Sequence, residues 1–133
     1  MKLLLDTHIW LWSVLEPAKL KKRVVRELID PANELWLSPI STWETVMLHE
    51  KRRLEIDGDV ADWIAERLQS SPVHEAPVTH EVAIEMDRVR LPHRDPADRF
   101  LVATAKVFKL TLVTSDSRLI KLRDISVLAN RAG

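Results

Sequence analysis

The stretch Leu3-Leu4-Leu5-Asp6 decides the fold class, because three consecutive apolar residues end at a single acid close to the start of the chain. A short, uninterrupted apolar run is typical of a strand that is buried on both faces of a parallel sheet. Comparable runs predict further strands over residues 33–38 and 110–114, and shorter ones over 73–78 and 126–128.

Segments with helical periodicity lie between these runs. We predict helices over 7–15, 20–29, 41–53, 60–68, 79–90 and 95–109, with Trp43, Val46 and Met47 pointing inward on the third of them. The helix over 95–109 is apolar on most of its surface, which predicts packing on several sides. Strands that alternate with helices favour right-handed crossovers. We therefore expect a single α/β domain over 1–133, a three-layer α/β/α sandwich around a mostly parallel sheet of four or five strands.

The composition excludes several classes of site. The 133 residues include 20 Lys and Arg against 20 Asp and Glu, no cysteine, and only two glycines, Gly58 and Gly133. A formal charge of zero excludes a uniformly basic nucleic-acid-binding surface. The lack of cysteine excludes disulfide scaffolds, thiolate metal sites and cysteine nucleophiles, and it fits a cytoplasmic protein. Two glycines cannot build a glycine-rich phosphate loop. The apolar runs are too short for a signal peptide or a bilayer span, so we expect no membrane association.

Acidic residues follow or flank the predicted strands. Asp6 ends the first strand, Glu44 lies near the start of the helix after the second, and Asp116 follows the strand over 110–114. Asp98, with Asp95 one turn before it, opens the most apolar helix. The carboxyl ends of parallel strands lie along one edge of a sheet, where such folds bind ligands, so we expect these acids to converge.

Converging acids need a compensating charge. Two carboxylates about 4 Å apart repel by roughly 4 kcal/mol at an effective dielectric of about 20, so the cluster is tolerable only with a cation or with some acids protonated. Oxygen ligands favour Mg²⁺ or Mn²⁺. Such ions polarise a phosphoryl oxygen and activate water, so hydrolysis of a phosphodiester needs no side-chain nucleophile.

Helix capping explains the same acids in another way. Ser41-Thr42-Trp43-Glu44 fits a capping box with Ser41 as the N-cap. Asp95-Pro96-Ala97-Asp98 fits a helix start with Asp95 as the N-cap and Pro96 at the first helical position. Capping and metal binding are compatible, and for each motif taken alone both interpretations stay open.

The motifs, in their order along the chain, resemble those of PIN-domain nucleases, and among them the VapC-type toxins of bacterial toxin–antitoxin pairs. The motifs are Leu3-Leu4-Leu5-Asp6-Thr7-His8, Ser41-x-Trp43-Glu44, Asp95-Pro96-x-Asp98-Arg99 and Val113-Thr114-Ser115-Asp116. The resemblance implies a PIN-like fold and Mg²⁺- or Mn²⁺-dependent endoribonuclease activity, with tRNA or ribosomal RNA as the expected substrates. It also implies a homodimer and a cognate antitoxin that blocks the site.

The resemblance also assigns roles by position. Asp6, Glu44 and Asp98 match the family's three principal acids, which would hold metal, and Asp116 matches the fourth and more variable one. In a second tier, Thr7 and Thr114 match polar positions that hydrogen-bond the acids or water, and Asp95 belongs to a variation of the third motif.

Basic residues and histidines near the motifs carry weaker expectations. Arg94 and Arg99 flank the third acidic motif, and we hypothesise that they contact RNA phosphates or an antitoxin carboxylate. The five histidines lack the spacing of a helical zinc motif, so we expect a surface or structural role for each. His8 and His93 are the ones we consider for substrate contact.

Two other functions stay open. A Mg²⁺-dependent phosphohydrolase of small molecules could use Asp6 as its nucleophile, although that chemistry usually places a second Asp where His8 stands. A non-catalytic protein- or RNA-binding module would use the acids only as helix caps, and it predicts little stabilisation by Mn²⁺.

Overall fold

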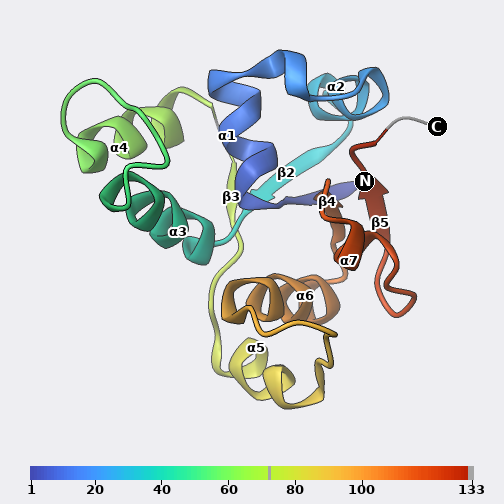
Figure 1. The fold of residues 1–133 in the computed structure, drawn as a ribbon. Helices are drawn as coiled ribbons and strands as arrows, with labels where there is room; N and C mark the ends of the chain where they lie inside the picture. Colours follow the sequence, from blue (N-terminus) through green and yellow to red (C-terminus); the bar gives the residue numbers. More distant parts are fainter. Residues whose placement is uncertain (72, 132–133) are drawn as a thin grey trace.

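A computed structural model, which describes residues 1–71 and 73–131, has one all-parallel sheet of five strands (Figure 1). The order across the sheet is β3-β2-β1-β4-β5. The strands are β1 (Lys2–Leu5), β2 (Glu34–Leu37), β3 (His74–Glu75), β4 (Thr111–Thr114) and β5 (Val127–Ala129). The predicted three-layer α/β/α architecture with a parallel sheet is confirmed.

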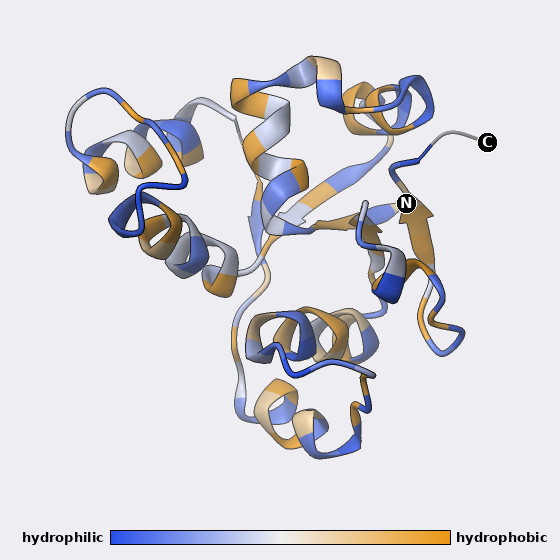
Figure 2. Cartoon of the chain, viewed as in Figure 1, coloured by the Kyte–Doolittle hydropathy of each residue, from blue (hydrophilic) through white to orange (hydrophobic). Residues whose placement is uncertain are grey.

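Helices cover both faces of the sheet (Figure 1). They are α1 (Thr7–Leu15), α2 (Lys22–Ile29), α3 (Pro39–Glu50), α4 (Val60–Ser70), α5 (His80–Glu85), α6 (Pro96–Phe108) and α7 (Ser117–Ile120), with short 3₁₀ turns at Pro17–Lys19 and Met86–Arg88. The helices mix apolar and polar residues, as expected for elements with one side against the sheet and one in water (Figure 2). None of the helices in the described ranges is both long and apolar enough to cross a membrane.

The first strand is buried on both faces, as the run of leucines predicts. Leu3 and Leu5 pack in a core with α1, α2 and α4, whereas Leu4 packs in a second core with α5 and α6. All three side chains are at most 2% exposed. Because successive side chains of a strand point to opposite faces, β1 contributes to both cores. It is also the central strand of the sheet.

The expected start of the third helix is wrong. α3 begins at Pro39 with Ser38 as its N-cap, whose Oγ accepts a hydrogen bond from Ile40 N at 3.0 Å. Ser41 therefore lies inside the first turn and is no cap, because Ser38 and Pro39 already provide the favoured cap and first-turn residues. Glu44 therefore does not complete a capping box with Ser41.

Trp43 is also not inward, because its indole is 54% exposed. The buried side of α3 carries Ser41 and Thr45, and Trp43 lies roughly 200° around the helix from Ser41. By contrast α6, over Pro96–Phe108, is packed on several sides as predicted, with buried residues such as Ala97, Leu101 and Ala105.

Other expected elements are shortened in the structure. The strand over 73–78 is reduced to His74–Glu75, and the helix over 79–90 is replaced by α5 followed by the 3₁₀ turn. The helix α7 that follows β4 had no predicted counterpart.

Candidate active site

The predicted acids meet at the carboxyl edge of the sheet, as expected from a parallel arrangement. One hollow of about 340 Å³ is lined by Asp6, His8, Trp12, Glu44, Asp95, Asp98, Ser115 and Asp116. Its acids come from the ends of β1 and β4, from α3 and from the start of α6. Residues separated by more than a hundred positions along the chain thus share one site.

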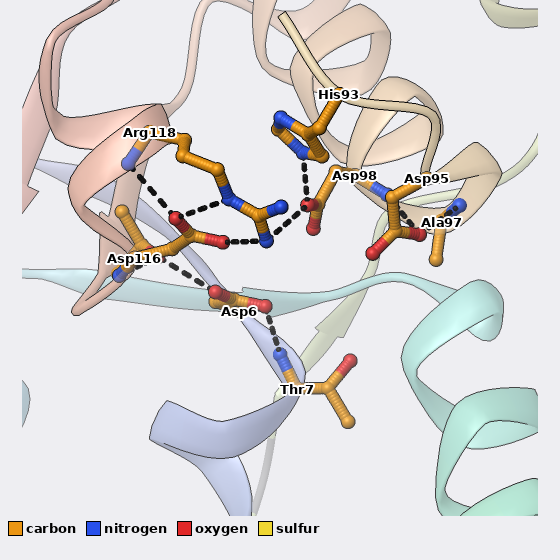
Figure 3. Close-up of polar contacts among 9 residues, drawn as sticks. Asp6, Thr7, His93, Asp95, Ala97, Asp98, Asp116 and Arg118 are labelled. Carbon is orange, nitrogen blue, oxygen red and sulfur yellow. Dashed lines mark hydrogen bonds and ion pairs between the residues drawn. The ribbon is translucent and has the colours of Figure 1, made fainter. Parts of the chain in front are cut away.

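Asp6 is held by hydrogen bonds to both of its carboxylate oxygens. It caps α1 by accepting from Thr7 N at 2.8 Å (Figure 3). Thr114 Oγ1 donates to the other oxygen at 2.6 Å. Burial raises the pKa of Asp6 above its ordinary value, although the hydrogen bond from Thr114 opposes the rise. Thr114 therefore orients Asp6 through its hydroxyl, and Thr7 bonds to Asp6 through its backbone N–H.

Glu44 is linked to Asp6 through Thr7, whose side chain hydrogen-bonds Glu44. Thr7 Oγ1 donates to Glu44 Oε1 and lies 2.9 Å from the buried Ser41 hydroxyl. This network links α1 to α3 and aims the Glu44 carboxylate at the hollow. Burial raises the pKa of Glu44, and the nearby charges of Asp6 and Asp95 add to the rise.

Asp95 and Asp98 line the hollow from the start of α6. Asp95 is the predicted N-cap and accepts from Ala97 N at 3.0 Å and more weakly from Asp98 N at 3.4 Å. Asp98 is buried, and His93 Nε2 hydrogen-bonds its Oδ2 at 2.7 Å. Burial, opposed by this hydrogen bond and aided by Asp95 and Asp6, raises the pKa of Asp98 to about 6.

Asp116 differs from the other acids because it has a cation beside it. It caps α7, and the guanidinium of Arg118 donates to both of its oxygens at 2.8 and 3.1 Å. This contact lowers the pKa of Asp116. The same Arg118 Nη2 lies 4.0 Å from Asp98 Oδ2, so the guanidinium stands between two of the acids (Figure 3).

Helix capping and the formation of a shared site are therefore compatible, because the same acids do both. Asp6, Asp95 and Asp116 are each the N-cap of a helix, and all three line the same hollow. Each helix N-terminus fixes its carboxylate and leaves part of it turned towards the hollow.

Two residues beyond the predicted acids join the site: His93, which the sequence suggested only for substrate contact, and Arg118, which no motif indicated. Ligand atoms of His93, Asp98 and Asp116 all lie within 4.8 Å of one another, which is compact enough to surround one ion. His93 hydrogen-bonds the principal acid Asp98 through its ring, which is compatible with both the structural role and the substrate contact considered for it from the sequence. Its position two residues before Asp95 was the available signal. Nothing local singled out Arg118 except its place two residues after Asp116.

Arg99 takes a different position from the acids. It lines a separate hollow beside Arg90, Arg94 and His93, and its Nη2 donates to the carbonyl of Met86 at 2.6 Å. This bond anchors the 3₁₀ turn to α6, so Arg99 does not enter the acidic hollow. Arg94 is exposed there, and its contact with phosphate stays a prediction.

The set of donors fits a hard divalent cation. Burial raises the pKa values of Asp6, Glu44 and Asp98, so a positive charge bound among these carboxylates would favour their ionised forms. His93 Nδ1 is also buried without a hydrogen-bond partner among the described residues. Carboxylate oxygens, with at most one imidazole, are ligands that suit Mg²⁺ and Mn²⁺.

Comparisons with known proteins identify a matching family and similar folds. A family model described as PIN domain matches residues 3–125. Ribonuclease VapC22 of Mycobacterium tuberculosis is 34% identical over 119 residues, which cover 87% of this chain and 88% of that protein. The fold is similar to that of a chain in the crystal structure of VapBC2 from Rickettsia felis bound to a DNA fragment from their promoter, with a TM-score of 0.72, 14% identity and coverage of 97% and 98% of the two chains. A chain of FitAcB from Neisseria gonorrhoeae gives a TM-score of 0.62 at 25% identity, with coverage of 96% and 97%.

Proposed function

Because the chain belongs to the PIN-domain family, we propose that it is a metal-dependent endoribonuclease and the toxin of a toxin–antitoxin pair. The observation that supports this most is the gathering of Asp6, Glu44, Asp98 and Asp116 in one hollow at the carboxyl edge of the sheet. The name of the curated relative, a ribonuclease, supports RNA as the substrate.

The acids would hold Mg²⁺ or Mn²⁺ directly or through water. When bound, such an ion polarises the phosphoryl oxygens, activates water and neutralises the leaving oxygen. The expected products carry a 5′-phosphate and a 3′-hydroxyl.

The chain's own residues keep the carboxylates in position. Thr114 Oγ1 and Thr7 N occupy one lone pair on each oxygen of Asp6, so that the remaining lone pairs face the hollow. His93 Nε2 fixes the rotation of the Asp98 carboxylate. Such hydrogen bonds to ligating groups orient them and tune metal affinity.

The test compares cleavage of total RNA by the wild type and by Asp6→Asn, with cleavage sites identified by sequencing. We expect cleavage that needs Mg²⁺ or Mn²⁺, stops with EDTA, and is lost in Asp6→Asn. Asp57→Asn is the matched control, because Asp57 is exposed in the loop before α4 and outside the hollow. Cleavage by Asp6→Asn at the wild-type rate would overturn the proposal. Phosphate release from a small monoester, with RNA intact, would favour a phosphohydrolase.

We also propose a cognate antitoxin as the protein partner and a homodimer as the assembly. Similar folds occur in solved VapBC complexes from several bacteria, which supports a protein partner for this chain. Co-purification with the product of a neighbouring reading frame, together with loss of RNA cleavage in that complex, tests the partner. Sedimentation of the isolated chain tests the dimer.

A further inference from the structure

A second hollow, of about 210 Å³, adjoins the acidic one. We call it the tryptophan hollow, and it is lined by Trp43, Met47, Lys51, Arg53 and Pro96. Glu44 and Asp95 line both hollows, so the two share a wall. Anything that occupies the tryptophan hollow therefore lies next to the acids.

Trp43 is the most unusual residue of this hollow. The other four tryptophans each pack a ring against another aromatic side chain: Trp10 against Trp63, Trp36 against Phe108, and Trp12 against His8. In the described part of the chain Trp43 has no such ring partner, and it is 54% exposed. Trp43 and Met47 on α3 and Lys51 at its C-cap are spaced by four residues, so they form one stripe.

The end of α3 brings two cations to the same hollow. Arg53 N donates to Leu48 O at 2.9 Å and Arg52 N to His49 O at 3.0 Å, while Arg52 adopts a left-handed φ of 58°. This turn is a Schellman cap, and it places both Lys51 and Arg53 on the wall of the hollow. Neither cation forms an ion pair with a described residue.

We propose that the tryptophan hollow binds a nucleotide of single-stranded RNA next to the phosphate that is cleaved, with the base stacked on Trp43 and the backbone held by Lys51 and Arg53. This rests on the proposed ribonuclease function and adds the residues that hold the nucleotide. A solvent-exposed indole beside unpaired cations is the combination that single-stranded nucleic acids bind through stacking and charge. A base within a duplex keeps its faces stacked on its neighbours, so it cannot stack on the indole.

An apolar protein segment is the competing occupant, and the charges disfavour it. Such a segment would gain from Trp43 and Met47 but would leave Lys51 and Arg53 unmatched. RNA uses both features, because its bases stack on Trp43 and its phosphates pair with Lys51 and Arg53. A phosphate at the shared wall of Glu44 and Asp95 would need a divalent cation to offset the repulsion by these acids.

The first test measures binding of a labelled single-stranded RNA in EDTA by fluorescence anisotropy, so that no cleavage occurs. Trp43→Ala should weaken binding about tenfold or more, whereas Trp43→Phe, which keeps a stacking ring, should stay within about threefold of the wild type. Ile84→Ala is the control, because Ile84 is a large apolar residue that is 63% exposed and lies on α5. Urea unfolding of each variant verifies that the fold is kept.

The second test separates stacking from charge. Lys51→Gln and Arg53→Gln should each make the dependence of log K on log salt shallower by about 0.7, the value expected for one phosphate contact on a single strand. Trp43→Ala should lower the affinity at every salt concentration and leave the slope unchanged. A duplex of the same sequence should bind wild type and Trp43→Ala equally.

Several outcomes would overturn this inference without touching the proposed function, which depends on cleavage by the wild type and its loss in Asp6→Asn. One is binding of single-stranded RNA by Trp43→Ala within about twofold of the wild type. Another is a loss of affinity in Trp43→Phe as large as that in Trp43→Ala, which would show that a stacking ring is not what binds the RNA. A third is a Trp43→Ala variant that binds RNA normally but no longer binds the antitoxin, which would assign the hollow to a protein segment.

Discussion

Replacing Asp98 by Asn should stabilise the metal-free protein at neutral pH. The Asp98 side chain is only 10% exposed, and its pKa is raised to about 6, mainly because burial disfavours the carboxylate. Raising the pKa from 3.8 to about 6 corresponds to about 3 kcal/mol in favour of the protonated form. The hollow is open to water and salt, which screen the charges, so we expect Asp98→Asn to gain about 1–2 kcal/mol at about pH 7.

The raised pKa of Asp98 sets the pH range over which this residue changes the free energy of unfolding. In the folded protein Asp98 stays protonated up to about pH 6, whereas in the unfolded chain it ionises near 3.8. Its contribution to stability is therefore fully present below about pH 4 and is lost as the pH rises to about 6. The difference between Asp98→Asn and the wild type should grow over that interval and vanish below it.

Urea unfolding in EDTA, followed by tryptophan fluorescence, measures this difference at both ends of the window. Asp57→Asn, which neutralises an exposed acid, should show no comparable gain. Mn²⁺ should then raise the unfolding midpoint of the wild type and not that of Asp98→Asn, because binding to the folded state alone stabilises it. A variant that is no more stable than the wild type at about pH 7, or whose advantage is the same at about pH 4, would refute the reasoning.

Three further substitutions probe single contacts. Thr114→Val removes the donor to Asp6 and should raise the pKa of that carboxyl further, weakening Mn²⁺ binding at neutral pH by roughly tenfold in calorimetry; an unchanged affinity would contradict this role. Arg118→Gln should tighten Mn²⁺ binding severalfold, because the guanidinium no longer competes for the Asp116 carboxylate; weaker binding would show that Arg118 supports the site instead. Lys109→Gly should raise the free energy of unfolding by about 1 kcal/mol, because Lys109 ends α6 with a left-handed φ of 55°; urea unfolding measures it, and a loss of stability would show that the lysine side chain matters there.

The local rules of the sequence were sufficient for the layers of the fold. Leu3, Leu4 and Leu5 indicate a strand buried on both faces, and the structure divides these side chains between two cores. The predicted start of α3 at Ser41 is wrong, although Ser38 followed by Pro39 also fits the pattern of an N-cap and a first helical residue. The local rules also failed for Trp43, since periodicity predicts that a helix has an apolar face but not which apolar residues it leaves in water.

By itself the sequence determined which acids could form a site, because Asp6, Asp98 and Asp116 each stand at a strand end or a helix start, where the backbone holds a carboxylate in a known direction. Only the tertiary structure decided that His93 and Arg118 join them. Their positions depend on the strand order that sets β1 beside β4 and on the loop that approaches α6, and such contacts between distant segments leave no periodic pattern along the chain.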